Sequence, residues 1–255
     1  MEGLPSYIPG VFFLTTVLTA LLFFKAFNNS RKVLVLFSCW VLLQCILGLN
    51  EFYTVTDVMP PRFLLAVLPP FILIAALFVT AKGRTFIDQA NLEYLTILHV
   101  IRIPVEVVLY WLFLHKAVPV LMTFEGWNLD IISGITAPFA LVVLLSKNSF
   151  KRKALLAWNL VCLALLINIV VIAILCLPFP FQKLAFDQPN IAVLYFPYVL
   201  LPAVIVPVVL FSHLVSIRQV LNKQEIDKPK MQPVPDRKHG SQMATTAMVP
   251  ANEQV

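Results

Sequence analysis

The chain has 255 residues and a mean hydropathy of +0.87, with 60% hydrophobic and 13% charged residues. Charged residues make up about a quarter of an ordinary soluble domain, so the lipid bilayer is the expected surrounding for most of this chain. The formal net charge of +6 does not indicate nucleic-acid binding, because the basic residues flank apolar segments and form no continuous patch.

Seven apolar segments follow one another, each close to the length of a membrane-spanning helix. We therefore predict an all-α, polytopic integral membrane protein with seven transmembrane helices. No room remains for a soluble catalytic domain. The segments cover residues 8–27, 33–49, 63–81, 94–115, 130–146, 154–177 and 191–217.

Basic residues concentrate in every second connection. Fifteen of the nineteen lysines and arginines follow the first, third, fifth and seventh segments, three lie in the other connections, and Arg102 lies inside a segment. Because cytoplasmic loops carry the excess of lysine and arginine, we predict an external N-terminus and a cytoplasmic C-terminus. Residues 1–7 are then a short external end, 8–217 the transmembrane domain, and 218–255 a polar cytoplasmic tail expected to be disordered beyond its first turns.

The fourth segment carries a polar stripe. At 100° per residue, His99, Arg102, Glu106 and Tyr110 fall within an arc of roughly 80° on one helix face. Arg102 and Glu106 are four residues apart and are expected to pair. Pro104 has no N–H, so it leaves the carbonyl of Val100 as an acceptor for a neighbouring side chain, water or ligand.

A charge at the bilayer centre costs ~2.5–3.5 kcal/mol, so we expect the stripe to face the protein interior. Intramembrane ionisable residues often mark a proton, ion or solute pathway, which favours a ligand or proton pathway along His99, Arg102, Glu106 and Tyr110. The alternative is a buried salt bridge that orients helices and binds nothing.

A loop with several polar residues follows the fourth segment. Glu125, Asn128 and Asp130 stand close together around Gly126, on the predicted outer face, where they could line a mouth or bind a cation. Asp130 could instead cap the fifth helix, and Glu125 could be a solvated loop charge. The apolar residues 118–124 are too few to span the membrane and are expected to dip into it or pack over the bundle.

Other features suggest structural roles. Pro197, Pro202 and Pro207 predict a broken seventh helix. Gln44, Asn159 and Asn168 are expected to form interhelical hydrogen bonds. The four cysteines are read as packing residues, and His99, His115 and His213 form no H-x-x-x-H pair, so we predict neither a metal nor a cofactor.

The run R-I-P-V-E at 102–106, followed by M-T-F-E-G-W-N-L-D-I-I-S-G-I-T-A-P at 122–138, resembles a group of uncharacterised seven-span bacterial inner-membrane proteins. The resemblance implies a multi-pass protein of the bacterial cytoplasmic membrane. It implies no activity.

These observations favour a protein that binds or transports a small polar solute or proton through a cavity lined by the fourth helix. An alternative is an intramembrane enzyme acting on a lipid or lipid-linked substrate, with Glu106 or His99 as acid or base, although no nucleophile constellation accompanies them. A third is a sensor or assembly subunit without catalysis. The sequence favours a non-enzyme and specifies no oligomeric state.

The predicted topology can be tested by labelling single cysteines at positions 57 and 150 in a cysteine-free variant. An impermeant thiol reagent applied to intact cells should label position 57 and leave position 150 protected. The reverse pattern would contradict an external N-terminus.

Overall fold

The computed structural model describes residues 3–145 and 149–226, and every regular element within them is a helix. The longer helices are α1 (Tyr7–Ala26), α2 (Arg31–Leu49), α3 (Leu64–Val79), α6 (Arg102–Leu114), α7 (Ile131–Leu145), α8 (Ser149–Leu175) and α9 (Val206–Ile226). The short ones are α4 (Ala81–Ile87), α5 (Leu92–Ile97), η1 (Phe52–Thr54), η2 (Leu98–Ile101), η3 (Val120–Met122), η4 (Ala192–Leu194) and η5 (Leu201–Ile205). The predicted all-α membrane class agrees with this architecture.

Five helical stretches are long and apolar enough to cross a membrane: 7–26, 31–49, 92–114, 152–175 and 201–222. A sixth is α3 together with α4, if this pair, bent by 98°, counts as one span. The seven spans and their orientation stay predictions. Helix α9 continues to Ile226, so the first turns after residue 217 are helical, and the rest of the predicted tail lies outside the described residues.

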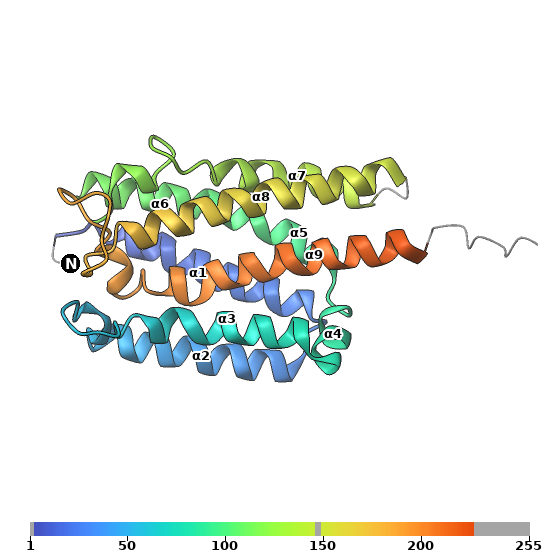
Figure 1. The fold of residues 1–255 in the computed structure, drawn as a ribbon, viewed down its shortest axis with the longest axis horizontal. Coiled ribbons are helices and arrows are strands. Elements are labelled where there is room, and N and C mark those ends of the chain that lie inside the picture. Colours follow the sequence, from blue (N-terminus) through green and yellow to red (C-terminus); the bar gives the residue numbers. More distant parts are fainter. Residues whose placement is uncertain (1–2, 146–148, 227–255) are drawn as a thin grey trace, which may run out of the picture.

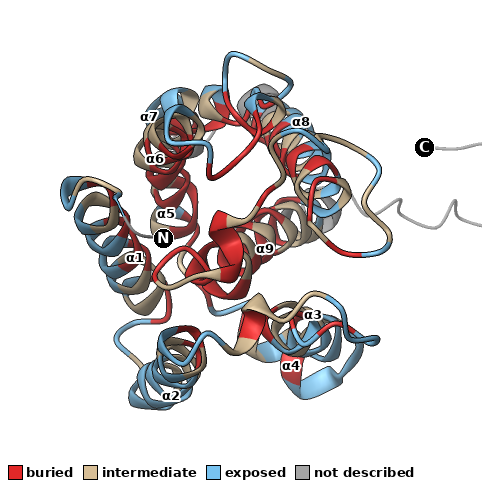
Figure 2. Ribbon diagram, turned by 90° about the vertical axis from the view of Figure 1, so that its left-hand side faces the viewer, coloured by how far each residue is buried: buried red, intermediate tan, exposed pale blue. Residues whose placement is uncertain are grey.

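The helices run roughly along one common direction (Figure 1). The N-terminus lies at the end that also holds the connections α2–α3, α6–α7 and α8–α9, while α4 and the end of α9 lie at the opposite end. Viewed end-on, α1, α5, α6, α7, α8 and α9 surround a buried interior, and α2 and α3 stand beside them with largely exposed surfaces (Figure 2). The exposed apolar side chains on α2 and α3 are what a bilayer would cover.

The predicted break in the seventh helix is present. The chain passes through η4, the π-turn η5 and then α9. Pro207 has no N–H to donate to the carbonyl of Ala203, four residues earlier. The indole Nε1 of Trp40, on α2, donates to that carbonyl at 2.9 Å. A side chain of one helix therefore satisfies a backbone group that proline frees in another.

A second polar contact ties α2 to the connection that follows it. The hydroxyl of Tyr53, in η1, donates to Oε1 of Gln44 at 2.6 Å, and both side chains are buried. Burial raises the pKa of Tyr53 to about 12, so the hydroxyl keeps the proton that it donates. Gln44 thus bonds a neighbouring element, as its position inside an apolar segment predicts.

Trp40→Phe should lower the thermal midpoint in detergent, because it removes the indole donor from the buried Ala203 carbonyl, a loss of ~1–3 kcal/mol. Trp127→Phe is the matched control, since that side chain is 63% exposed. Equal midpoints for the two variants would show that the Trp40 bond does not stabilise the broken helix.

A buried polar cluster as the candidate functional site

The predicted fourth segment is one continuous helical stretch made of α5, η2 and α6. It tightens into the 3-10 turn η2, which ends at Ile101, three residues before Pro104, and the carbonyls of His99 and Val100 accept backbone N–H groups at the end of that turn. The expectation of a free Val100 carbonyl is therefore wrong. The local 3-10 turn supplies the donor that Pro104 cannot.

Three members of the polar stripe are buried. His99 is 0%, Arg102 3% and Glu106 2% exposed. Tyr110 is only half-buried, and its ring lies 4.9 Å from that of Phe124. The helix thus presents His99, Arg102 and Glu106 to the protein interior, whereas Tyr110 packs beneath the α6–α7 connection.

Arg102 forms its ion pair with Asp130 and not with Glu106, so the expected pairing along the helix is wrong. An Arg102 guanidinium nitrogen donates to Asp130 Oδ1 at 2.8 Å, and both side chains are buried. Asp130 directly precedes α7, which packs tightly against the stretch that carries Arg102. A Cβ added to Gly134 would lie 2.9 Å from Ile103 Cγ1 and 3.3 Å from Arg102 Cβ, so only glycine permits this approach.

Glu106 instead accepts a hydrogen bond from Asn128. Asn128 Nδ2 donates to Glu106 Oε1 at 2.6 Å and to the Met122 carbonyl at 3.0 Å, and Asn128 Oδ1 accepts the Asp130 N–H at 3.1 Å. The second carboxylate oxygen, Glu106 Oε2, is buried and has no hydrogen-bond partner. One amide therefore holds the connection, the acid and the start of α7 together.

The three polar residues of this connection do not form one outer mouth. Asn128 and Asp130 are buried in the cluster, while Glu125 is exposed. The preceding apolar stretch packs over the bundle, because Val118 and Met122 are buried in the main core. Folding the connection inward brings Asp130 to Arg102.

His213, on α9, completes the polar cluster, although sequence reasoning did not place it there. The cluster consists of His99, Arg102, Glu106, Asn128, Asp130, Asn159 and His213. His213 Nε2 lies 3.1 Å from an Arg102 guanidinium nitrogen, and its Nδ1 lies 2.9 Å from Asn159 Oδ1 on α8. Its ring stacks on that of His99 at 3.9 Å between centroids. His213 could have been found from the sequence, because it is an ionisable residue inside an apolar segment, and the same criterion identified Arg102.

Of the two other amides expected to bond between helices, Asn159 does so and Asn168 bonds a connection instead. Asn159 joins α8 to α9 through His213. Asn168 Nδ2 donates to the Trp127 carbonyl at 2.9 Å, which joins α8 to the α6–α7 connection. No group of three or more His, Cys, Asp or Glu residues is arranged for a metal ion within residues 3–145 and 149–226.

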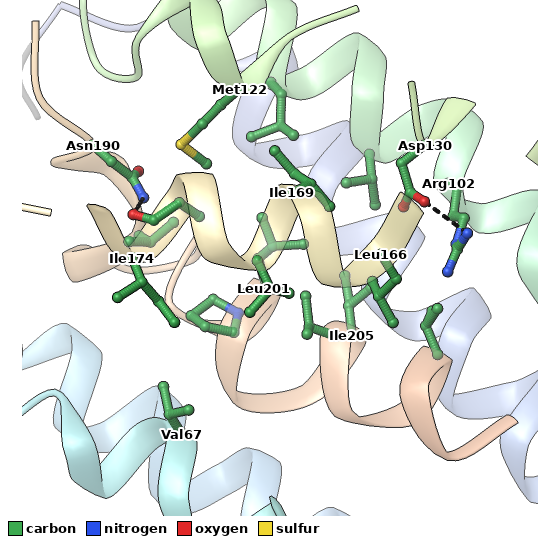
Figure 3. Close-up of a pocket in the computed structure, with 18 of the residues that line it drawn as sticks. Val67, Arg102, Met122, Asp130, Leu166, Ile169, Ile174, Asn190, Leu201 and Ile205 are labelled. Carbon is green, nitrogen blue, oxygen red and sulfur yellow. Dashed lines mark hydrogen bonds and ion pairs between the residues drawn. The ribbon is translucent and has the colours of Figure 1, made fainter. Parts of the chain in front are cut away.

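A cavity of about 100 Å³ lies against this cluster. Figure 3 shows Arg102 and Asp130 at one end and Asn190 at the other, with Met122, Ile169 and Leu201 among the apolar side chains between them. Glu106 also lines the cavity. The wall reaches the outer surface between α3 and α8, because Val67 and the exposed Ile174 belong to it.

The charged residues of the cavity wall are one cation, Arg102, and two acids, Asp130 and Glu106. Arg102 is bonded to Asp130 and makes no direct ion pair with Glu106, so the wall carries one more acid than it has cations. An unpaired carboxylate in an apolar cavity favours a bound proton, a cationic group or a hydrogen-bond donor. The site can therefore take up a positive or donating group at Glu106.

Residues 59–221 match the model of a protein family described as "Domain of unknown function (DUF8737)". The chain belongs to this family. The matched range contains the whole polar cluster and leaves out α1 and α2. No curated protein and no solved structure matches the chain.

Gly134→Ala should destabilise the protein by ~1–3 kcal/mol, because its methyl group forces α7 away from Ile103 and Arg102. Gly10→Ala is the control: nothing lies within 4 Å of its added Cβ, so this variant should be neutral or slightly stabilised. Thermal unfolding of both variants in detergent measures the difference. A Gly134→Ala variant as stable as the wild type would contradict the close approach.

Proposed function

We propose that this protein binds, within the membrane, a small ligand that carries a cationic or hydrogen-bond-donating group on an apolar body. The ligand sits in the cavity lined by α6, with its polar group at Glu106. This proposal narrows the small polar solute expected from the sequence to one that has an apolar part. A carrier of such a ligand would use the same site.

The observation that carries the proposal is the free carboxylate oxygen of Glu106. Glu106 is 2% exposed, its Oε2 has no partner, and the residue lines a cavity. Buried polar groups are nearly always hydrogen-bonded, so an orphaned acid beside a cavity favours a missing donor. Asn128 already holds the other oxygen and thereby fixes the carboxyl group in place.

The rest of the wall selects for an apolar body. Apart from Arg102, Glu106, Asp130 and Asn190, all the lining side chains are apolar, and they come from α3, α6, α8, η5 and α9 among others. A fully hydrated solute would lose its water without replacement there. The exposed Ile174 places one margin of the wall at the surface that lipid would cover, which supports entry from the bilayer.

A bound proton is the second candidate, because it would satisfy the same carboxylate oxygen without an apolar body. The lining residues include no serine, threonine, cysteine or histidine, so an enzymatic role would have to do without a side-chain nucleophile of these types. The two candidates, a ligand with an apolar body and a proton alone, differ in whether an apolar amine binds at Glu106.

The test is calorimetric titration of the detergent-solubilised protein with pentylamine, 1-pentanol and pentanoate. The amine should bind most tightly, the alcohol more weakly and the anion least, because Glu106 accepts a proton or a donor and repels a carboxylate. Glu106→Gln should weaken amine binding by roughly 10- to 100-fold, the effect of losing a charge-assisted hydrogen bond.

Glu125→Gln is the matched control, since that carboxylate is exposed and does not line the cavity. It should leave amine binding unchanged. Equal binding of all three probes, or equal loss in the two variants, would refute the proposed ligand class. Proton uptake that depends on Glu106, without any amine binding, would favour the proton.

A further inference from the structure

A second cavity, of about 250 Å³, lies between α1, α2, α3 and α9 and is separate from the polar cluster. All its lining side chains are apolar, and they include Trp40, Pro69, Pro70 and Phe211. An apolar cavity of ~150 Å³ is enough for a benzene molecule, so this one holds a longer stretch of hydrocarbon. No group in it would bond a polar solute.

The cavity opens toward the surface that lipid would cover. Leu36 of α2 and Leu73 of α3 line it, and they are 61% and 45% exposed. In the end-on view α2 and α3 are the two helices that stand beside the main bundle (Figure 2). A hydrocarbon chain can thus enter sideways between them.

One end of the cavity meets a basic rim. Phe27, Val33 and Phe86 line that end, where α1 turns into α2 and where α4 bends away from α3. Arg31 and Lys32 directly precede Val33, Lys82 lies one helical turn before Phe86 on α4, and all three basic residues are exposed. Asp88, just after α4, does not offset them, because both its carboxylate oxygens bond Arg218 at 2.8 and 2.9 Å.

We propose that this cavity holds an acyl chain of an anionic phospholipid, whose phosphate lies against Arg31, Lys32 and Lys82. The apolar wall fits the chain, and the basic rim complements the headgroup charge. The acyl chain lies against the π-turn η5 and the start of α9, because Ala203, Val204 and Pro207 also form the wall. The bound lipid would therefore contact α2, α3 and α9 together and stabilise their packing.

The experiment uses phosphatidylglycerol brominated at mid-chain, titrated into phosphatidylcholine nanodiscs that contain the protein. Bromine quenches tryptophan fluorescence at short range, and Trp40 lines the cavity. In a variant with Trp111, Trp127 and Trp158 replaced by phenylalanine, brominated phosphatidylglycerol should quench Trp40 saturably. Brominated phosphatidylcholine should quench it only in proportion to its mole fraction. Native mass spectrometry of the wild type, which counts retained lipid, gives a second measurement independent of that variant.

The charge variant is Lys32→Gln with Lys82→Gln, which should weaken phosphatidylglycerol binding roughly thirtyfold. Lys116→Gln with Lys183→Gln is the matched control, because it removes the same charge from exposed residues far from the cavity lining. Equal affinity for both lipids, or equal loss in both double variants, would overturn the proposal. A dimer in solution that Leu73→Trp converts to a monomer would also overturn the proposal, because a second copy of the protein, and not a lipid, would then cover the opening.

Discussion

The buried ion pair between Arg102 and Asp130 is the interaction on which the rest of the interior depends. Breaking such a pair commonly costs ~3–5 kcal/mol, because the remaining charge stays buried without a partner. Keeping it requires that α7 begin beside η2 and α6, which Gly134 permits, and that the α6–α7 connection fold inward. The same fold brings Asn128 to Glu106, a residue of the cavity wall, and leaves the second carboxylate oxygen of Glu106 without a partner.

Two backbone carbonyls that lose a helical donor to proline accept a hydrogen bond from elsewhere. At Pro104 a local 3-10 turn supplies the donor, and at Pro207 the indole of Trp40 does so from another helix. Side chains of the cavity wall are less fully satisfied: Glu106 Oε2, Arg102 Nε and Asn190 Oδ1 are buried without a hydrogen-bond partner, and Glu106 is the acid among them. Glu106 belongs to the wall of a cavity whose one cation, Arg102, is bonded to Asp130, and this is the observation on which the proposed ligand rests.

Much of the architecture follows from hydropathy, because each helix needs only its own residues to be recognised. The apolar segments indicate where the helices lie, and the three prolines indicate an interrupted seventh helix. The cost of inserting a charge into the bilayer predicts that Arg102 and Glu106 face the protein interior. The partner of Arg102 was not predictable in the same way. The four-residue spacing favoured Glu106, whereas Asp130 and His213 reach Arg102 only through the inward fold of one connection and the packing of α9, which depend on tertiary contacts.

The most direct test of this account is a pair of double-mutant cycles for stability in detergent. One cycle combines Arg102→Leu with Asp130→Leu, and the other combines Arg102→Leu with Glu106→Leu. We expect a coupling free energy on the order of 2–3 kcal/mol in the first cycle and a clearly smaller one in the second, because directly bonded groups couple most strongly. A larger coupling between Arg102 and Glu106 would contradict the account, since Glu106 would then be half of the structural pair and no longer free for a ligand.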